Sequence, residues 1–180
     1  FLPPYDTCAT LERLAATLDA YDAATVICLG DSFHDNGADE RMSARDRETL
    51  SMLQEGREWI WLTGNHDTAI AECFGGHVVP ELPVSGLTFR HEPAAGPVTH
   101  EVAGHLHPAA RVSFHGHVIR RPCFVGNGNR LVLPAFGTYA GGLNVLDDAF
   151  APLFGAGGLS VLVLGQEGLY PIAPRLLKED

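Results

Sequence analysis

Apolar residues in the first third of the chain recur either at helical spacing or in short continuous runs, and the two patterns alternate. Leu11, Leu14 and Leu18 share one face of a helix that Thr7 can cap, and a short apolar run follows it. Ser43 can cap a second helix, which leads into a second apolar run. The pattern predicts, in order, a helix over 7–21, a strand over 25–29, a helix over 43–55 and a strand over 59–62.

After Gly75 and Gly76 the chain changes to closely spaced β-like runs, at 77–79, 87–90, 101–103, 110–114, 123–125 and 131–133. Asn127-Gly128 predicts a hairpin turn between the last two runs, and a final hairpin is predicted from 159–164 and 169–172. Helices alternating with strands, followed by many short strands, indicate an α/β fold with two mixed sheets flanked by helices. We expect one domain over residues 1–180.

Composition narrows the class of protein. The chain has 180 residues, is 46% hydrophobic and has no apolar run as long as a membrane span, which is typical of a globular protein. Its formal charge of −10 has the wrong sign for a broad basic face that holds nucleic acid. Any polynucleotide contact is therefore expected to be small, or to rely on a partner's basic surface.

The four cysteines are widely spaced and form no C-x-x-C pair. This usage is typical of a reducing, cytoplasmic setting, and no disulfide is needed to explain it.

Polar residues with catalytic potential follow both of the first two predicted strands. Asp31, after Gly30, could bridge two metal ions through its carboxylate, although an isolated Gly-Asp pair is usually an ordinary turn. Asn65, His66 and Asp67 follow the second strand in the same position. An amide oxygen is a hard metal ligand, an imidazole can protonate a leaving alkoxide, and Asp67 could orient that imidazole. The alternative, an Asn-containing turn with an exposed histidine, is less favoured because the two segments match in position.

Two histidines further along have the spacing of a ligand pair. On an extended segment His105 and His107 would point to the same side, and Gly104 would permit a close backbone approach. His115 and His117 have the same spacing with no other ligand nearby, so the spacing alone does not identify a site.

His91 is the remaining candidate ligand. It ends another apolar run, where a lone histidine is more often structural or exposed than a ligand. The interpretation of His91 as a ligand is strengthened because an ion held by Asp31, Asn65 and His105 would still need another nitrogen or oxygen.

Taken together, these segments resemble the calcineurin-like metallophosphoesterase superfamily. The motifs are Gly30-Asp31, Gly64-Asn65-His66-Asp67, His91 and Gly104-His105-Leu106-His107. Within the superfamily, the flanking sequences are similar to the bacterial ligase-associated DNA damage response endonucleases, the PdeM family. Those flanks are 1–7, 29–37, 89–93, 134–137 and 141–145.

The resemblance implies a four-layer α/β/β/α sandwich with two divalent metal ions, manganese in the first place, with iron or zinc as alternatives. Asp31 would bridge the ions. Asn65, His91 and His105 would complete one metal site, and His107 would bind the other ion. His66 would stabilise the transition state and protonate the leaving oxygen.

One family motif is missing from this chain. Such sites begin with an Asp-x-His pair on the first strand, and the sequence opens at Phe1 without it. We expect that residues preceding Phe1 exist in the natural protein, and that this chain has the sandwich without its first strand and with two ligands of the second ion lacking.

The leading hypothesis is a metal-dependent phosphodiesterase, an endonuclease that acts on single-stranded or damaged DNA. The resemblance implies a setting in DNA repair with a DNA ligase and a helicase as partners, and no membrane. One alternative keeps the metal site but gives it a small nucleotide-type substrate, which the acidic charge favours. Another is a phosphoesterase fold reused as a non-catalytic scaffold.

Overall fold

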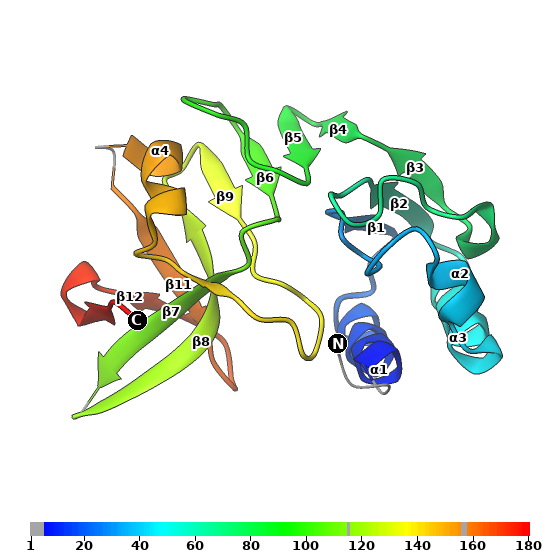
Figure 1. The fold of residues 1–180 in the computed structure, drawn as a ribbon, viewed down its shortest axis with the longest axis horizontal. Helices are drawn as coiled ribbons and strands as arrows, with labels where there is room; N and C mark the ends of the chain where they lie inside the picture. The colour runs from blue at the N-terminus through cyan, green and yellow to red at the C-terminus, as the bar shows by residue number, and fades with distance from the viewer. Residues whose placement is uncertain (1–5, 115, 156–157) are drawn as a thin grey trace. The chain divides into compact units, whose positions relative to one another are not determined.

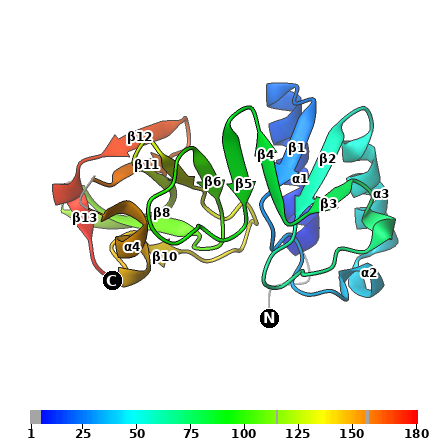
Figure 2. The same cartoon turned by 90° about the horizontal axis from the view of Figure 1, so that it is seen from above.

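The computed structural model of the protein describes residues 6–114, 116–155 and 158–180, which form two compact units. The first unit extends to Leu82 and includes Phe136–Ala140; the second comprises Pro83–Ala135 and Gly141–Asp180. Figures 1 and 2 show the elements of both. The single domain predicted over 1–180 stays a prediction. Residues 1–5 of the first resembling flank, and His115, lie outside the described residues.

The first unit contains a three-stranded parallel sheet in the order β1–β2–β3. Its elements are α1 (Asp6–Tyr21), β1 (Thr25–Cys28), α2 (Ala38–Arg41), α3 (Ala44–Gln54), β2 (Glu58–Leu62), the 3-10 helix η1 (Glu72–Phe74) and β3 (His77–Val79). The four elements predicted before residue 63 are all present. Ser43 caps α3 as expected, because its hydroxyl accepts a hydrogen bond of 3.1 Å from the backbone N–H of Asp46.

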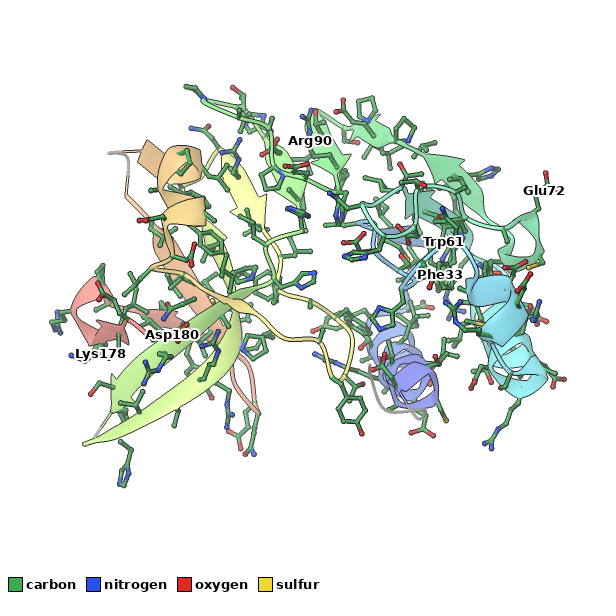
Figure 3. All side chains as sticks on the ribbon, viewed as in Figure 1. Phe33, Trp61, Glu72, Arg90, Lys178 and Asp180 are labelled. Atoms are coloured by element: carbon green, nitrogen blue, oxygen red, sulfur yellow. The ribbon has the colours of Figure 1, made fainter. Side chains whose placement is uncertain are left out.

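An aromatic core holds the first unit together. Trp59 and Trp61 of β2 are buried with leucines of α1 and α3. Phe33, from the loop after β1, stacks on Phe74 with ring centroids 4.4 Å apart. Figure 3 shows Phe33 next to Trp61, with ring centroids 5.5 Å apart. Phe33 therefore anchors the loop that begins with Asp31.

The helices are short. The longest, α1, has 16 residues and buries only Leu11 and Leu18. Among the described helices, none combines the length and the apolarity that a membrane span requires.

The second sheet has ten strands and reaches its edge at β4, where the chain passes from the first unit to the second. Its main path runs β10-β7-β8-β9-β6-β5-β4, with β11 and β12 joined to β8 and with β13 joined to β7. The elements are β4 (Glu81–Val84), β5 (Leu87–Arg90), β6 (Glu101–Ala103), β7 (Pro108–Phe114), β8 (His117–Gly126), β9 (Arg130–Val132), β10 (Leu143–Asn144), η2 (Asp148–Phe150), α4 (Ala151–Phe154), β11 (Ser160–Leu164), β12 (Leu169–Ile172), η4 (Pro174–Leu176) and β13 (Leu177–Lys178).

Both predicted hairpins are present. At the first, the Asn127 side chain accepts hydrogen bonds from the backbone N–H groups of Asn129 and Arg130, each 3.0 Å long. Gly128 supplies the positive φ of +87° that such a turn favours. The second hairpin joins β11 to β12 in antiparallel register.

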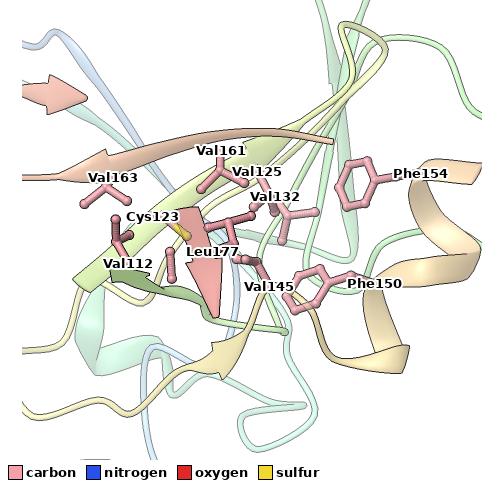
Figure 4. Packing of buried hydrophobic residues seen from close by; sticks show 11 residues of the cluster. Val112, Cys123, Val125, Val132, Val145, Phe150, Phe154, Val161, Val163 and Leu177 are labelled. Carbon is pink, nitrogen blue, oxygen red and sulfur yellow. The ribbon is translucent and has the colours of Figure 1, made fainter. Parts of the chain in front are cut away.

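The core of the second unit is aliphatic, with two phenylalanines from η2 and α4 closing one end (Figure 4). Cys123 is fully buried among valines and acts as a small apolar residue. Burial raises the pKa of both Cys123 and Cys28 to about 12, so that these thiols stay protonated at neutral pH. All four cysteines are free.

Candidate metal centre

Asp31 follows β1 in a conformation that few residues adopt. Its φ is +49°, and that of Gly30 is +82°. The left-handed region is costly for most side chains, although aspartate tolerates it better than bulky residues. One Asp31 carboxylate oxygen accepts a hydrogen bond of 2.9 Å from the backbone N–H of His66. The loops that follow β1 and β2 are therefore tied together at the carboxyl ends of two paired strands, where Cys28 lies beside Trp61.

Asp67 fixes the shape of this pair of loops. One of its carboxylate oxygens accepts hydrogen bonds from the backbone N–H groups of Asp31 and Gly64, both 2.9 Å long. The other accepts from Ser32 at 2.7 Å and from Phe33 at 3.1 Å. These four bonds fill the acceptor capacity of a carboxylate, and the residue is only 1% exposed. Asp67 thus holds the Asp31 turn; its predicted action on the His66 imidazole stays a prediction.

Gly64 is required by the closeness of the two loops. A Cβ atom there would collide with the backbone nitrogen and a carboxylate oxygen of Asp31, and would lie 2.8 Å from Asp67. Glycine is therefore needed at position 64, the first residue of the Gly64-Asn65-His66-Asp67 motif, so that the Asp31 turn can pack against it.

We expect Asp67→Asn to destabilise the first unit by about 2 kcal/mol, because an amide nitrogen replaces the oxygen that two backbone N–H groups use. Urea unfolding followed by tryptophan fluorescence measures the change, since Trp59 and Trp61 lie in this unit's core. Asp19→Asn is the matched control, because Asp19 is exposed on α1 in the same unit. Equal losses in both variants would contradict the assigned role of Asp67.

The other candidates of the first unit, Asn65 and His66, are exposed at the end of β2. Their backbone is fixed by the neighbouring bonds of Gly64, His66 and Asp67, while their side chains stand at the surface of the unit. This placement suits a ligand and a proton donor that must reach a bound substrate.

In the second unit, His91 and His105 form a pair of facing imidazoles. Nε2 of His91 lies 3.1 Å from Nδ1 of His105, with ring centroids 5.0 Å apart and ring planes at 78°. His91 is 5% exposed. The pair is set by the parallel register of β5 and β6, which the Gly104 N–H extends with a 2.9 Å bond to the His91 carbonyl. Two converging imidazole nitrogens are a common start of a transition-metal site.

His105 and His107 lie in a strained turn, so the expected extended segment is wrong. The Leu106 N–H donates to the Gly104 carbonyl at 2.8 Å, which closes a three-residue γ-turn around His105. The φ angles of His105 and His107 are +65° and +46°. The turn arises because β6 ends at Ala103 and β7 starts at Pro108. Such conformations persist where surrounding contacts impose them, and they cluster at functional sites.

His107 is supported by a segment that the sequence analysis did not assign to the site. The Leu143 N–H donates to the His107 carbonyl at 3.0 Å, where β10 joins β7. A Cβ atom at Gly142 would lie 2.6 Å from the same carbonyl. The glycine pair before Leu143 is the feature of the sequence that could have indicated this contact.

A buried ion pair braces the connection between His91 and β6. Arg130 and Glu101 are paired with side chains only 1% and 2% exposed. Arg130 also donates to the carbonyls of Ala94, Gly96 and Leu153, and the Ala94 N–H donates to Glu101 at 3.0 Å. Nothing in the sequence pattern marked these two charges as partners.

The donor atoms have the chemistry of a divalent-metal site. In the first unit Asp31 offers a carboxylate, and in the second unit His91 and His105 offer two imidazole nitrogens 3.1 Å apart. One carboxylate with two imidazoles suits manganese, iron and zinc. The residues present therefore fit the group that the resemblance implies.

Comparison with known proteins shows a likeness to a solved nuclease structure. No family model matches the chain, and no curated protein matches it either. The structure is similar to the crystal structure of nuclease MPE from Pseudomonas putida. The TM-score is 0.71, the sequence identity is 26%, and the match covers 92% of this chain and 78% of that one. This likeness and the two observed sheets with flanking helices confirm the predicted fold class, an α/β fold of the metallophosphoesterase sandwich type.

Proposed function

We propose that this protein is a divalent-metal-dependent phosphodiesterase that cleaves DNA, with single-stranded or damaged DNA as the substrate. The observation that carries the metal-dependent chemistry is the pair of facing ring nitrogens of His91 and His105. The likeness to a nuclease supports a nucleic acid as substrate. A repair setting with a DNA ligase and a helicase, and a cytoplasmic location, are hypotheses that rest on the resemblance alone.

The proposed ligands divide between two ions. Asp31, Asn65, His91 and His105 would hold one, and Asp31 would also reach a second ion bound by His107. When bound, such ions would neutralise charge on the phosphate and activate water for attack. Manganese is the first candidate for both ions.

The residues of the chain perform the remaining tasks. Asp67 keeps Asp31 in its turn through four backbone bonds, so the carboxylate is oriented before any ligand binds. His66, exposed beside Asn65, would donate a proton to the leaving oxygen.

Two competing functions differ in their support. A small nucleotide-type phosphodiester as substrate is favoured by the net charge of −10, which repels a long polyanion. A scaffold without catalysis would require no metal, yet the candidate ligands from Asp31 to His107 are all present in the sequence.

We expect His66→Ala to slow manganese-dependent cleavage of labelled single-stranded DNA by about a hundredfold or more, because the leaving oxygen loses its proton donor. His77→Ala, an exposed histidine of β3, should retain the parental rate. Metal stoichiometry should be equal in all three proteins. An unchanged rate in His66→Ala would remove His66 from the mechanism, and cleavage of bis(p-nitrophenyl) phosphate without any DNA cleavage would favour the small substrate.

A further inference from the structure

The positive charges of this acidic chain are unevenly distributed. Residues 102–146 contain four arginines and no aspartate or glutamate, whereas the rest of the chain carries eight lysines or arginines and all 22 acidic residues. The acid-free segment includes His105 and His107 and the hairpin formed by β7 and β8. This segment therefore brings positive charge and no acidic side chain of its own to the second unit.

Two arginines of the hairpin stand side by side. In the antiparallel register of β7 and β8, Arg111 pairs directly with Arg120. Directly opposed residues lie on the same face of the sheet, and like charges there destabilise a strand pair. Such a pair needs an anion near it.

The Asp180 carboxylate is that anion, as the position of Asp180 next to the hairpin in Figure 3 illustrates. One of its oxygens lies 2.6 Å from Arg120 and 3.9 Å from Arg111. The same oxygen accepts a hydrogen bond of 3.3 Å from the side-chain amide of Asn144, which is only 4% exposed. Arg111 also donates to the backbone carbonyl of Glu179. Two guanidinium groups and a buried amide thus converge on one anionic oxygen.

The donors are held in place independently of Asp180. A second nitrogen of Arg120 donates to the Gly142 carbonyl at 2.6 Å, and Asn144 is fixed by the pairing of β10 with β7. The Asn144 amide also donates to the Lys178 carbonyl at 2.9 Å. Gly142 is the residue that packs against the His107 carbonyl. The anion site is therefore built on the segments that support a proposed metal ligand.

We propose that Arg111, Arg120 and Asn144 form a binding site for a backbone phosphate of single-stranded nucleic acid, and that the Asp180 carboxylate occupies it until substrate arrives. This inference rests on the proposed function, because it assigns the contact that holds the substrate strand. The Arg120 and Asp180 side chains are 42% and 58% exposed, and an ion pair that exposed is weak. A phosphate, which carries more acceptor oxygens and can accept from two guanidinium groups together, can displace it.

The test is the affinity of the full chain for a fluorescein-labelled single-stranded oligonucleotide, measured by anisotropy in EDTA so that no cleavage occurs. We expect Arg120→Ala to weaken binding about tenfold and to reduce the salt dependence of log K by about 0.7, the loss of one phosphate contact. Asp180→Asn should tighten binding severalfold, because a neutral side chain competes less well with phosphate.

Arg121→Ala is the matched control. Arg121 neighbours Arg120, but it pairs with Ala110 and so projects from the opposite face of the hairpin. It should change the affinity less than twofold. Equal weakening by Arg120→Ala and Arg121→Ala would show diffuse attraction and overturn the site, as would an unchanged affinity in Asp180→Asn. Inorganic phosphate at millimolar concentration should not compete; if it does so as well as the oligonucleotide, the site is for free phosphate.

Failure of this inference can be distinguished from failure of the proposed function. Hydrolysis of bis(p-nitrophenyl) phosphate with manganese does not need the strand contact, so Arg120→Ala should retain it. Retained hydrolysis with unchanged oligonucleotide binding overturns the phosphate site alone. No hydrolysis of any diester by the parental protein overturns the proposed function, while the binding measurements still decide the site.

Discussion

The Asp31→Asn variant is expected to fold normally and to cleave labelled DNA roughly a thousandfold more slowly than the parental protein. The substitution is nearly isosteric. Asparagine keeps an oxygen that can accept the 2.9 Å bond from the His66 N–H, and it tolerates the φ of +49° that position 31 adopts. The change therefore removes the negative charge that would bridge two cations and leaves the turn in place.

Asp22→Asn provides a matched control, since Asp22 has a φ of +46° and also follows a secondary structure element, the helix α1. It should affect neither rate nor metal binding. Single-turnover cleavage in manganese gives the rate, and calorimetric titration gives the metal stoichiometry. A rate for Asp31→Asn within a few-fold of the parental protein would show that the negative charge of Asp31 does not contribute to catalysis.

The second large effect is expected for Arg130→Met, which should lower the free energy of unfolding of the second unit by about 3–5 kcal/mol. The substitution removes the buried cation beside Glu101, leaving an ion-pair contact of 3.4 Å with the partly exposed Arg90, and it takes one donor from each of the carbonyls of Ala94, Gly96 and Leu153. Since this network braces the connection between His91 and β6, metal affinity should fall as well. Urea unfolding followed by circular dichroism measures the loss of stability.

Two further variants separate charge burial from the loss of packing. Glu101→Leu combined with Arg130→Met should recover part of the lost stability, because the buried carboxylate is removed and the neighbouring cation, Arg90, is 28% exposed. Arg41→Met breaks an ion pair in which the side chains of Arg41 and Asp35 are 56% and 57% exposed. It should leave the midpoint of urea unfolding unchanged. If the double variant were no more stable than Arg130→Met, the buried Glu101 carboxylate would not be the cause of the lost stability.

Local signals accounted for much of the fold. Ser43 predicted the start of α3 and Asn127-Gly128 predicted the turn between β8 and β9, because capping and turn chemistry act over three or four residues. The first half of β8, at His117–Arg121, was missed. Its residues show no buried face, and only the pairing with β7 makes them a strand. The two-residue strand β10 likewise exists only through its neighbour.

For the site, the sequence identified side chains but not the contacts that position them. The placement of Asp31 and Asn65 after successive strands follows from chain order, and the parallel pairing of β1 with β2 brings their loops together. The contacts of Asp67 with the backbone N–H groups of residues 31–33, and the pairing of Arg130 with Glu101, join residues 29 to 36 positions apart. No periodicity records contacts at that separation, so the sequence could not reveal them.

The left-handed residues of the site have a consequence for protein engineering. Asp31, His105 and His107 all have positive φ angles, where glycine would relieve backbone strain. A screen that selects variants only for thermal tolerance would be drawn to these positions, because a residue compatible with its backbone often raises stability. Each such gain would delete a proposed metal ligand. Libraries built on this scaffold should therefore hold the three positions constant and seek added robustness in the hairpin and helix surfaces instead.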